Sequence, residues 1–147
     1  MLNDFLNSVK GEVLDQLSGK TNLESAKLNG VAVVVTGTFK DGLLDKFKSG
    51  QLGDIAGLLK KGGSTTPFAG VLTNNTVANL ISKLGLPKSV SNTVASIAVP
   101  FIINKLGSFA TSKGKSGEKG VSDLLGDLVK GSVKDKLLGG LGKKLGF

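Results

Sequence analysis

The residue types missing from this chain limit the chemistry that it can perform. It contains no His, Cys, Tyr or Trp, and all nineteen of its basic residues are Lys, so Arg is missing too. Without His and Cys, zinc sites of the usual kinds are excluded, as are Ser-His and Cys-His nucleophiles. Without Arg, no bidentate clamp can hold a phosphate or a guanine. Catalysis would have to come from Asp, Glu, Lys, Ser and Thr alone.

Two local patterns could be taken for reactive sites, and neither holds up. Asp41 and Asp45 are one helical turn apart, but lysines at 40, 46 and 48 surround them, which is typical of an exposed, charged helix face. Residues 113–116 resemble a phosphate-binding loop, yet Phe109 stands where that loop needs glycine. We therefore expect no enzyme, no cofactor, no metal and no small-molecule substrate.

The charge distribution leaves a different kind of function open. The net charge is +8, and no acidic residue lies between Asp54 and Glu118. Such a segment can meet a polyanion such as nucleic acid, or it can simply be a solvated surface that keeps an aliphatic protein soluble. If it does bind a polyanion, the lysines that we expect to make the contact are Lys60, Lys61, Lys83 and Lys88.

The hydrophobic pattern predicts helices throughout. The chain has 147 residues, enough for one domain, and 39% are hydrophobic with few aromatics, so the core should be aliphatic. Apolar residues recur at intervals of three and four, which is typical of helices with one buried face. We predict an all-α bundle of about six or seven short helices, near residues 3–18, 22–49, 52–59, 68–84, 89–106, 121–129 and 133–145.

The stretch from Val31 to Thr38 is ambiguous, because its β-branched residues also favour a strand. We predict a helix there, since the stripe of residues at intervals of four continues to Phe47.

Local signals predict where several helices begin and end. Gly19 should end the first helix, and Gly85 followed by Pro87 should end the fourth. Ser89 should cap the next helix, and Pro100 should kink it near Val99.

The C-terminal part is set apart by composition. Residues 1–110 form the predicted helical domain, residues 111–119 a polar linker, and residues 120–147 amphipathic helices and a Gly/Leu-rich tail. The tail should pack either on the same domain or on a neighbouring copy. The leucines that we expect to support self-association are Leu124, Leu125, Leu128, Leu137, Leu138 and Leu141. The cationic segment from residue 130 onward could instead lie on an anionic membrane.

The order of these parts resembles the bacterial YidB-like family of unknown function. The resemblance rests on the opening amphipathic helix and the Pro-initiated helix that ends at residues 83–86. It also rests on the sequence of residues 98–106, on the run at 123–128 and on the Gly/Leu tail. It implies an all-α fold without known catalytic residues. It also implies a helix-turn-helix-like element, compared with a homeodomain, which would fall on residues 73–106.

A DNA-binding element of that kind needs an exposed second helix with polar side chains that reach bases and phosphates. The polar residues available for this are Lys88, Ser91, Asn92, Thr93 and Ser96. Most of residues 94–103 is apolar and favours burial, so two packed core helices with a Gly/Pro corner explain the pattern better than a DNA-binding element does. The missing Arg is a departure from what DNA recognition usually requires.

These observations favour a non-enzymatic structural or scaffolding protein that self-associates through aliphatic, glycine-containing helix faces. A nucleic-acid-binding protein is the alternative, and peripheral membrane binding by the tail is a third possibility. The sequence shows no signal peptide, and its longest apolar run, residues 97–103, is too short to cross a bilayer, so we expect a cytoplasmic protein.

Overall fold

The structure is a computed structural model that describes residues 2–21, 23–60, 63–114 and 120–126. Of the described residues 89% are helical, and none forms a strand, which confirms the predicted all-α fold. The elements are α1 (Leu2–Lys20), α2 (Ser25–Lys48), α3 (Leu52–Leu59), the 3-10 helix η1 (Gly63–Thr65), α4 (Pro67–Leu84) and α5 (Lys88–Ser112). Residues 120–126 are also helical.

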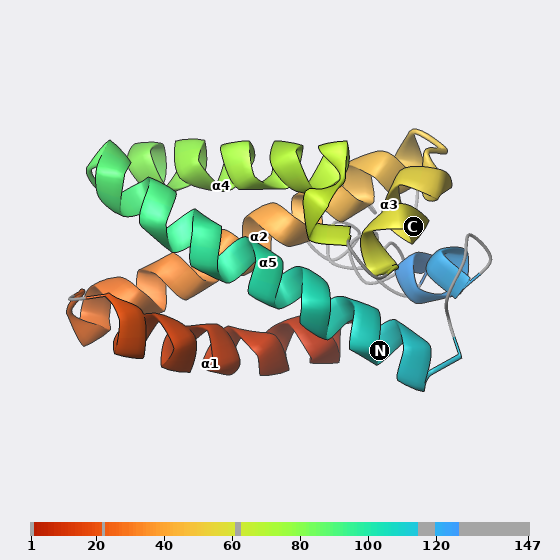
Figure 1. The fold of residues 1–147 in the computed structure, drawn as a ribbon, viewed down its shortest axis with the longest axis horizontal. Coiled ribbons are helices and arrows are strands. Elements are labelled where there is room, and N and C mark those ends of the chain that lie inside the picture. The colour runs from red at the N-terminus through yellow and green to blue at the C-terminus, as the bar shows by residue number, and fades with distance from the viewer. Residues whose placement is uncertain (1, 22, 61–62, 115–119, 127–147) are drawn as a thin grey trace, which may run out of the picture.

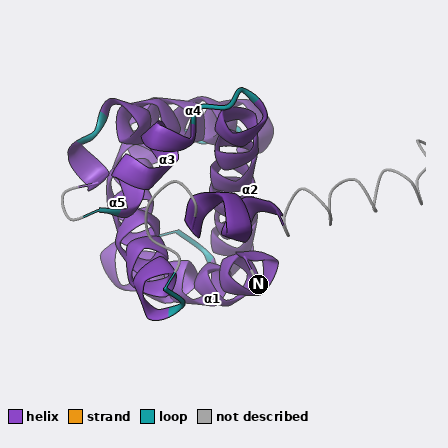
Figure 2. Ribbon diagram, turned by 90° about the vertical axis from the view of Figure 1, so that its right-hand side faces the viewer, coloured by secondary structure: helices purple, strands orange, loops and turns teal. Residues whose placement is uncertain are grey.

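The four long helices surround one core. α1 packs against α2 and α5, and α4 packs against the same two helices, so α1 and α4 lie on opposite sides (Figure 1). Viewed from one end, α1, α2, α4 and α5 enclose a common centre (Figure 2). α3 and η1 lie at the end where α2 finishes, and both contact α4 and α5. The bundle is therefore closed by helix packing on every side rather than built in layers.

The core is aliphatic, as its composition predicts. Its largest fully buried side chains are Phe39, Leu17, Leu43, Ile55, Leu58, Leu72, Leu80, Ile102, Ile103 and Leu125. On α2 the stripe at intervals of four points inward, and Val31, Val35, Phe39 and Leu43 are all buried. The helix prediction for residues 31–38 is thus confirmed, because burial of this stripe outweighs the strand preference of single valines.

α4 begins at a side-chain cap and ends at the predicted glycine. The Thr66 hydroxyl accepts a hydrogen bond from the Ala69 N–H at 3.3 Å and Pro67 opens α4. Gly85 closes that helix in the left-handed conformation, with φ of 66°, and its N–H donates to the Ile81 carbonyl at 3.0 Å. Only glycine adopts this φ without strain, so the position of the turn is fixed by one residue.

Two predicted helix ends are wrong. α1 does not stop at Gly19 but continues to Lys20, where the Thr21 N–H still donates to the Leu17 carbonyl at 2.8 Å. Ser89 does not cap α5, which begins one residue earlier and has no side-chain cap. Pro87, whose φ of −59° already suits a helix start, precedes the first turn instead.

The predicted linker also begins too early, whereas the kink expected at Pro100 stays a prediction. The helix continues through Pro100 to Ser112, so two residues of the predicted linker belong to it. Ala110 is buried, and the hydroxyl of Thr111 donates to the Gly107 carbonyl at 2.9 Å. Burial at the end of the helix therefore outweighs the polar composition from which the linker was predicted.

Two glycines allow backbones to approach closely at the α3 end. A Cβ added to Gly107 of α5 would lie 2.9 Å from the Leu59 carbonyl oxygen, and one added to Gly63 would overlap the backbone of Leu58. Backbone atoms cannot rotate away as a side chain can, so these positions have no room for a larger residue.

We predict that Gly63→Ala destabilises the protein by about 1–3 kcal/mol, because the new methyl group overpacks against backbone. Gly11→Ala is the matched control, since a Cβ there meets nothing within 4 Å, and it should stabilise by about 0.5–1 kcal/mol. Urea unfolding followed by circular dichroism measures both. Equal effects of the two changes would contradict the close packing at Gly63.

Candidate functional site

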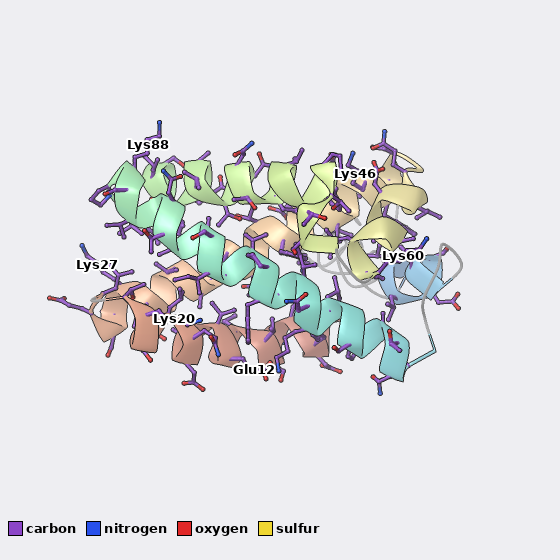
Figure 3. All side chains as sticks on the ribbon, viewed as in Figure 1. Glu12, Lys20, Lys27, Lys46, Lys60 and Lys88 are labelled. Atoms are coloured by element: carbon purple, nitrogen blue, oxygen red, sulfur yellow. The ribbon has the colours of Figure 1, made fainter. Side chains whose placement is uncertain are left out.

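Lysines from four elements gather at one end of the bundle. Lys20 ends α1, Lys27 lies in the first turn of α2, and Lys88 opens α5; all three are exposed and lie at the same end in Figure 3. Lys83 lies in the last turn of α4, next to the same corner. We call these four residues the basic end. The segments that meet there, residues 20–27 and 83–93, carry a single acidic residue, Glu24.

A groove of about 440 Å³ opens at the basic end, between the end of α1 and the start of α5. Its lining residues are Lys20, Thr21, Leu23, Ser89, Val90 and Thr93. The first turn of α5 has no side-chain cap, so its N–H groups add partial positive charge to that of the lysines. The lining of the groove combines a positive charge and three hydroxyl groups with two apolar side chains, and the charge and hydroxyls suit an anionic group.

The four lysines predicted to contact a polyanion do not form one surface. Lys83 and Lys88 belong to the basic end, whereas Lys60 lies at the opposite end of the bundle, beside α5 residues such as Gly107 (Figure 3). Lys61 lies outside the described residues. The folded surface instead joins Lys83 and Lys88 to Lys20 and Lys27, which the sequence did not single out because residues 1–30 are slightly acidic.

The helix-turn-helix-like element is only partly exposed. α4 and α5 form a packed hairpin around Gly85, and Lys88, Asn92, Thr93 and Ser96 are exposed on α5. Ser91, also predicted as an available polar residue, is fully buried, and its hydroxyl has no hydrogen-bond partner. The helical periodicity turns Ser91 toward the core together with Val94 and Ala95, which are also buried.

The leucines predicted for self-association are corrected in part. Leu124 and Leu125 are each only 2% exposed, and together with Val121 they line a small gap against Leu43, Ile55, Leu59 and Leu106. They close the chain's own core and are not an exposed face. Leu128, Leu137, Leu138 and Leu141 lie outside the described residues, as does the cationic segment considered for membrane binding.

Asp41 and Asp45 are exposed, as predicted, and share a groove of about 350 Å³ with Asn75 and Asn79 of α4. In the part of the chain that the structure describes, neither carboxylate forms an ion pair, and Lys46 pairs with Asp54 at 3.0 Å instead. No group of three or more acidic side chains that could hold a metal ion occurs among the residues described.

The large apolar side chains that are exposed all lie on one pair of helices. Among the described residues they are Val33 on α2, at 55%, and Val71, Ile81 and Leu84 on α4, at 36–47%. The sequence pattern did not distinguish these residues. Val33, for example, belongs to the apolar run 31–35, most of which is buried. Which side chains of such a run stay exposed depends on which neighbouring helix covers each turn.

One helix, α5, is long and apolar enough to cross a membrane by length and composition alone. Its most apolar 18 residues have a mean hydropathy of 1.4, and 44% of them are buried. α5 packs against α1, α3 and α4, as the core helix of a soluble bundle does. The length and apolar composition of α5 are therefore only weak evidence for a membrane span.

Comparisons of the chain with protein-family models, with curated proteins and with solved structures found no match. The resemblance to the YidB-like family stays a prediction. Function is therefore inferred from the chain's own charges, exposed side chains and packing.

We predict that Leu125→Ala lowers the free energy of unfolding by about 2–5 kcal/mol, because it leaves a cavity in the core. Val71→Ala, at an exposed position of α4, should cost no more than about 0.5 kcal/mol. Urea unfolding followed by circular dichroism suits a chain without Trp or Tyr. If Leu125→Ala changed only the association of the protein and not its stability, the assignment of Leu125 to the core would be wrong.

Proposed function

We propose that the protein is a non-enzymatic cytoplasmic scaffold that self-associates through aliphatic, glycine-containing faces of α2 and α4. One observation carries this proposal: the exposed large apolar side chains of the described residues all lie on these two helices. Covering Val33 and Ile81 with another copy would remove apolar surface from water, which favours association by about 25 cal/mol per Å².

Glycines on α2 support the same conclusion. A glycine inside a helix costs about 1 kcal/mol relative to alanine, so it is expected where close packing needs it. Gly42 fits that expectation within the chain, since a Cβ there would lie 2.5 Å from the Leu72 side chain. At Gly37 an added Cβ meets nothing within 4 Å, so the chain's own packing gives no reason for this glycine.

We expect the purified protein to have a molar mass above the 15.0 kDa of one chain, and to keep it at high salt, because apolar contacts are not screened. Val33→Lys combined with Ile81→Lys should weaken association at least tenfold, since burying each apolar side chain contributes about 1.5–3 kcal/mol. Light scattering at low and high salt measures both effects, and negative-stain microscopy shows any larger particles.

The control for this test is Asn7→Lys, which adds charge at an exposed position of α1 and should leave association unchanged. A wild-type molar mass of one chain at all concentrations and both salts would refute the scaffold.

A second function, binding of nucleic acid or another polyanion, is supported by the basic end and its groove. Lys20 and the first residues of α5 line the groove together, and only Glu24 opposes the positive charge in the adjoining segments. Lysine is a point charge that contacts phosphates without reading bases. Binding at this end would therefore be weak, independent of sequence and strongly dependent on salt.

For this second function we predict that Lys20→Gln combined with Lys88→Gln weakens binding of labelled double-stranded DNA at low salt. The slope of log affinity against log salt concentration should become less steep by about 1–2. The reason is that each lost phosphate contact lowers the number of counterions that DNA releases on binding. Fluorescence anisotropy measures the affinity. Lys60→Gln, at the opposite end of the bundle, should have little effect, and no binding by the wild-type protein at low salt would remove this function.

A further inference from the structure

One face of α2 points away from the core and carries a distinct order of side chains. Lys27, Gly30, Val34, Gly37 and Asp41 follow each other at intervals of three and four, so they share one face of the helix. We call these five residues the α2 seam. α2 buries its opposite face, and α1 and α4 flank it on either side.

The middle of the α2 seam is small and accessible. Gly30 and Val34 are half-buried, and the Leu84 side chain of α4 already lies within 3.3 Å of where a Cβ of Gly30 would stand. At Gly37, by contrast, an added Cβ meets nothing within 4 Å, and Val33, next to Val34, is 55% exposed. The open space at Gly37 lets a second helix come close to the backbone beside Val34, and the two valines supply apolar surface to cover. The middle of this face is therefore shaped for a helix rather than for a small molecule.

The two ends of the α2 seam carry opposite charges. Lys27 and Asp41 are both exposed, and neither forms an ion pair with another described residue. They are fourteen residues apart, or about 21 Å along the helix at about 1.5 Å per residue. Val34 stands midway between them. If a second α2 helix is placed by a 180° rotation about an axis at Val34, Lys27 of each copy faces Asp41 of the other copy.

We propose that two copies of the chain associate through the α2 seam, with the two α2 helices antiparallel and Val34 of each copy next to the two-fold axis. This inference rests on the proposed self-association and names its surface and symmetry. Lys27 of each copy then faces Asp41 of the other, and each Gly37 faces the other copy's helix near Val31. A face that complements itself in this way gives a closed dimer, because both copies use the same surface.

The two lysines in the last turn of α2 are compatible with this register. Lys48, near the end of the helix, would lie beyond the first residue of the partner's α2, Ser25, because positions 25 and 43 face each other. Lys46 is held by Asp54 at 3.0 Å and by Gln51 at 2.8 Å. Contact that is centred on one helix from each copy, with exposed side chains of the flanking α4 at its edge, is at the small end of specific interfaces, so we expect a reversible dimer that forms with rising concentration.

The test exchanges the two charges and uses the full chain throughout. Lys27→Asp alone and Asp41→Lys alone each place two like-charged pairs across the dimer, and each should weaken dimerisation roughly tenfold. A 1:1 mixture of the two variants should form mixed dimers, and the chain with both changes should dimerise again. Light scattering over a range of concentrations gives the dissociation constants. Both changes are at exposed positions, and aspartate in the first turn of a helix is favourable, so folding should be kept.

A second variant tests the close approach of the helices. Gly37→Leu should abolish dimerisation while the fold stays intact or gains stability, since the space is open in one copy and leucine favours a helix. Gly11→Leu, on α1 and equally open, is the matched control and should leave the dimer unchanged.

The outcomes separate this inference from the scaffold proposal. A wild-type protein that stays a monomer at every concentration would overturn both. Association that none of the changes at positions 27, 37 and 41 alters would overturn the α2 seam while self-association stands. Weakening by each single charge change with no recovery in the mixture or in the chain with both changes would also overturn the pairing of Lys27 with Asp41.

Discussion

The structure depends on the burial of α5 between the other helices. α1 and α4 do not hold each other; each packs against α2 and α5, and α3 also rests on α5. The sequence makes this possible, because no charged residue occurs between Lys88 and Lys105. Nine residues of α5 are buried, from Ser91 to Ala110. A helix with this composition has no stable place in water unless several partners cover it, so the bundle forms around it.

The chain has no His, Tyr, Trp or Arg that could make long-range polar contacts in its core. Aliphatic side chains fill the interior, and the hydroxyls of Thr36, Thr38 and Thr76 donate to carbonyls one turn earlier in their own helices. Such local bonds satisfy buried polar groups without fixing how helices pair. The Asn79 side chain is an exception, since it donates to Thr38 at 2.8 Å and links α4 to α2. Specific packing therefore rests mainly on shape, and on glycines such as Gly107.

Sequence periodicity was sufficient for the fold class and for most helices, but it could not give the surface. The stripe from Val31 to Leu43 identifies the buried face of α2 whatever lies next to it, because 3.6 residues per turn set which side chains align. Whether Val33 stays exposed depends on how α1 and α4 flank that helix. Lys20 and Lys88 are 68 positions apart and lie at the same end of the bundle only because α1 ends at the end where α5 begins (Figure 3). For the same reason Leu124 and Leu125 could be predicted to be apolar and helical, but not to close their own core.

The placement of Leu124 and Leu125 has a consequence for how the chain is made. Val121, Leu124 and Leu125 cover Leu43, Ile55 and Leu106 at one end of the bundle, and they come after all four long helices in the chain. Leu124 follows Leu106, the last of these residues to be made, by 18 positions, so at about 5–20 residues per second a ribosome needs about 1–4 s between the two. For that interval the newly made helices carry an open apolar end. A nascent chain is then a better target for a chaperone than the finished protein.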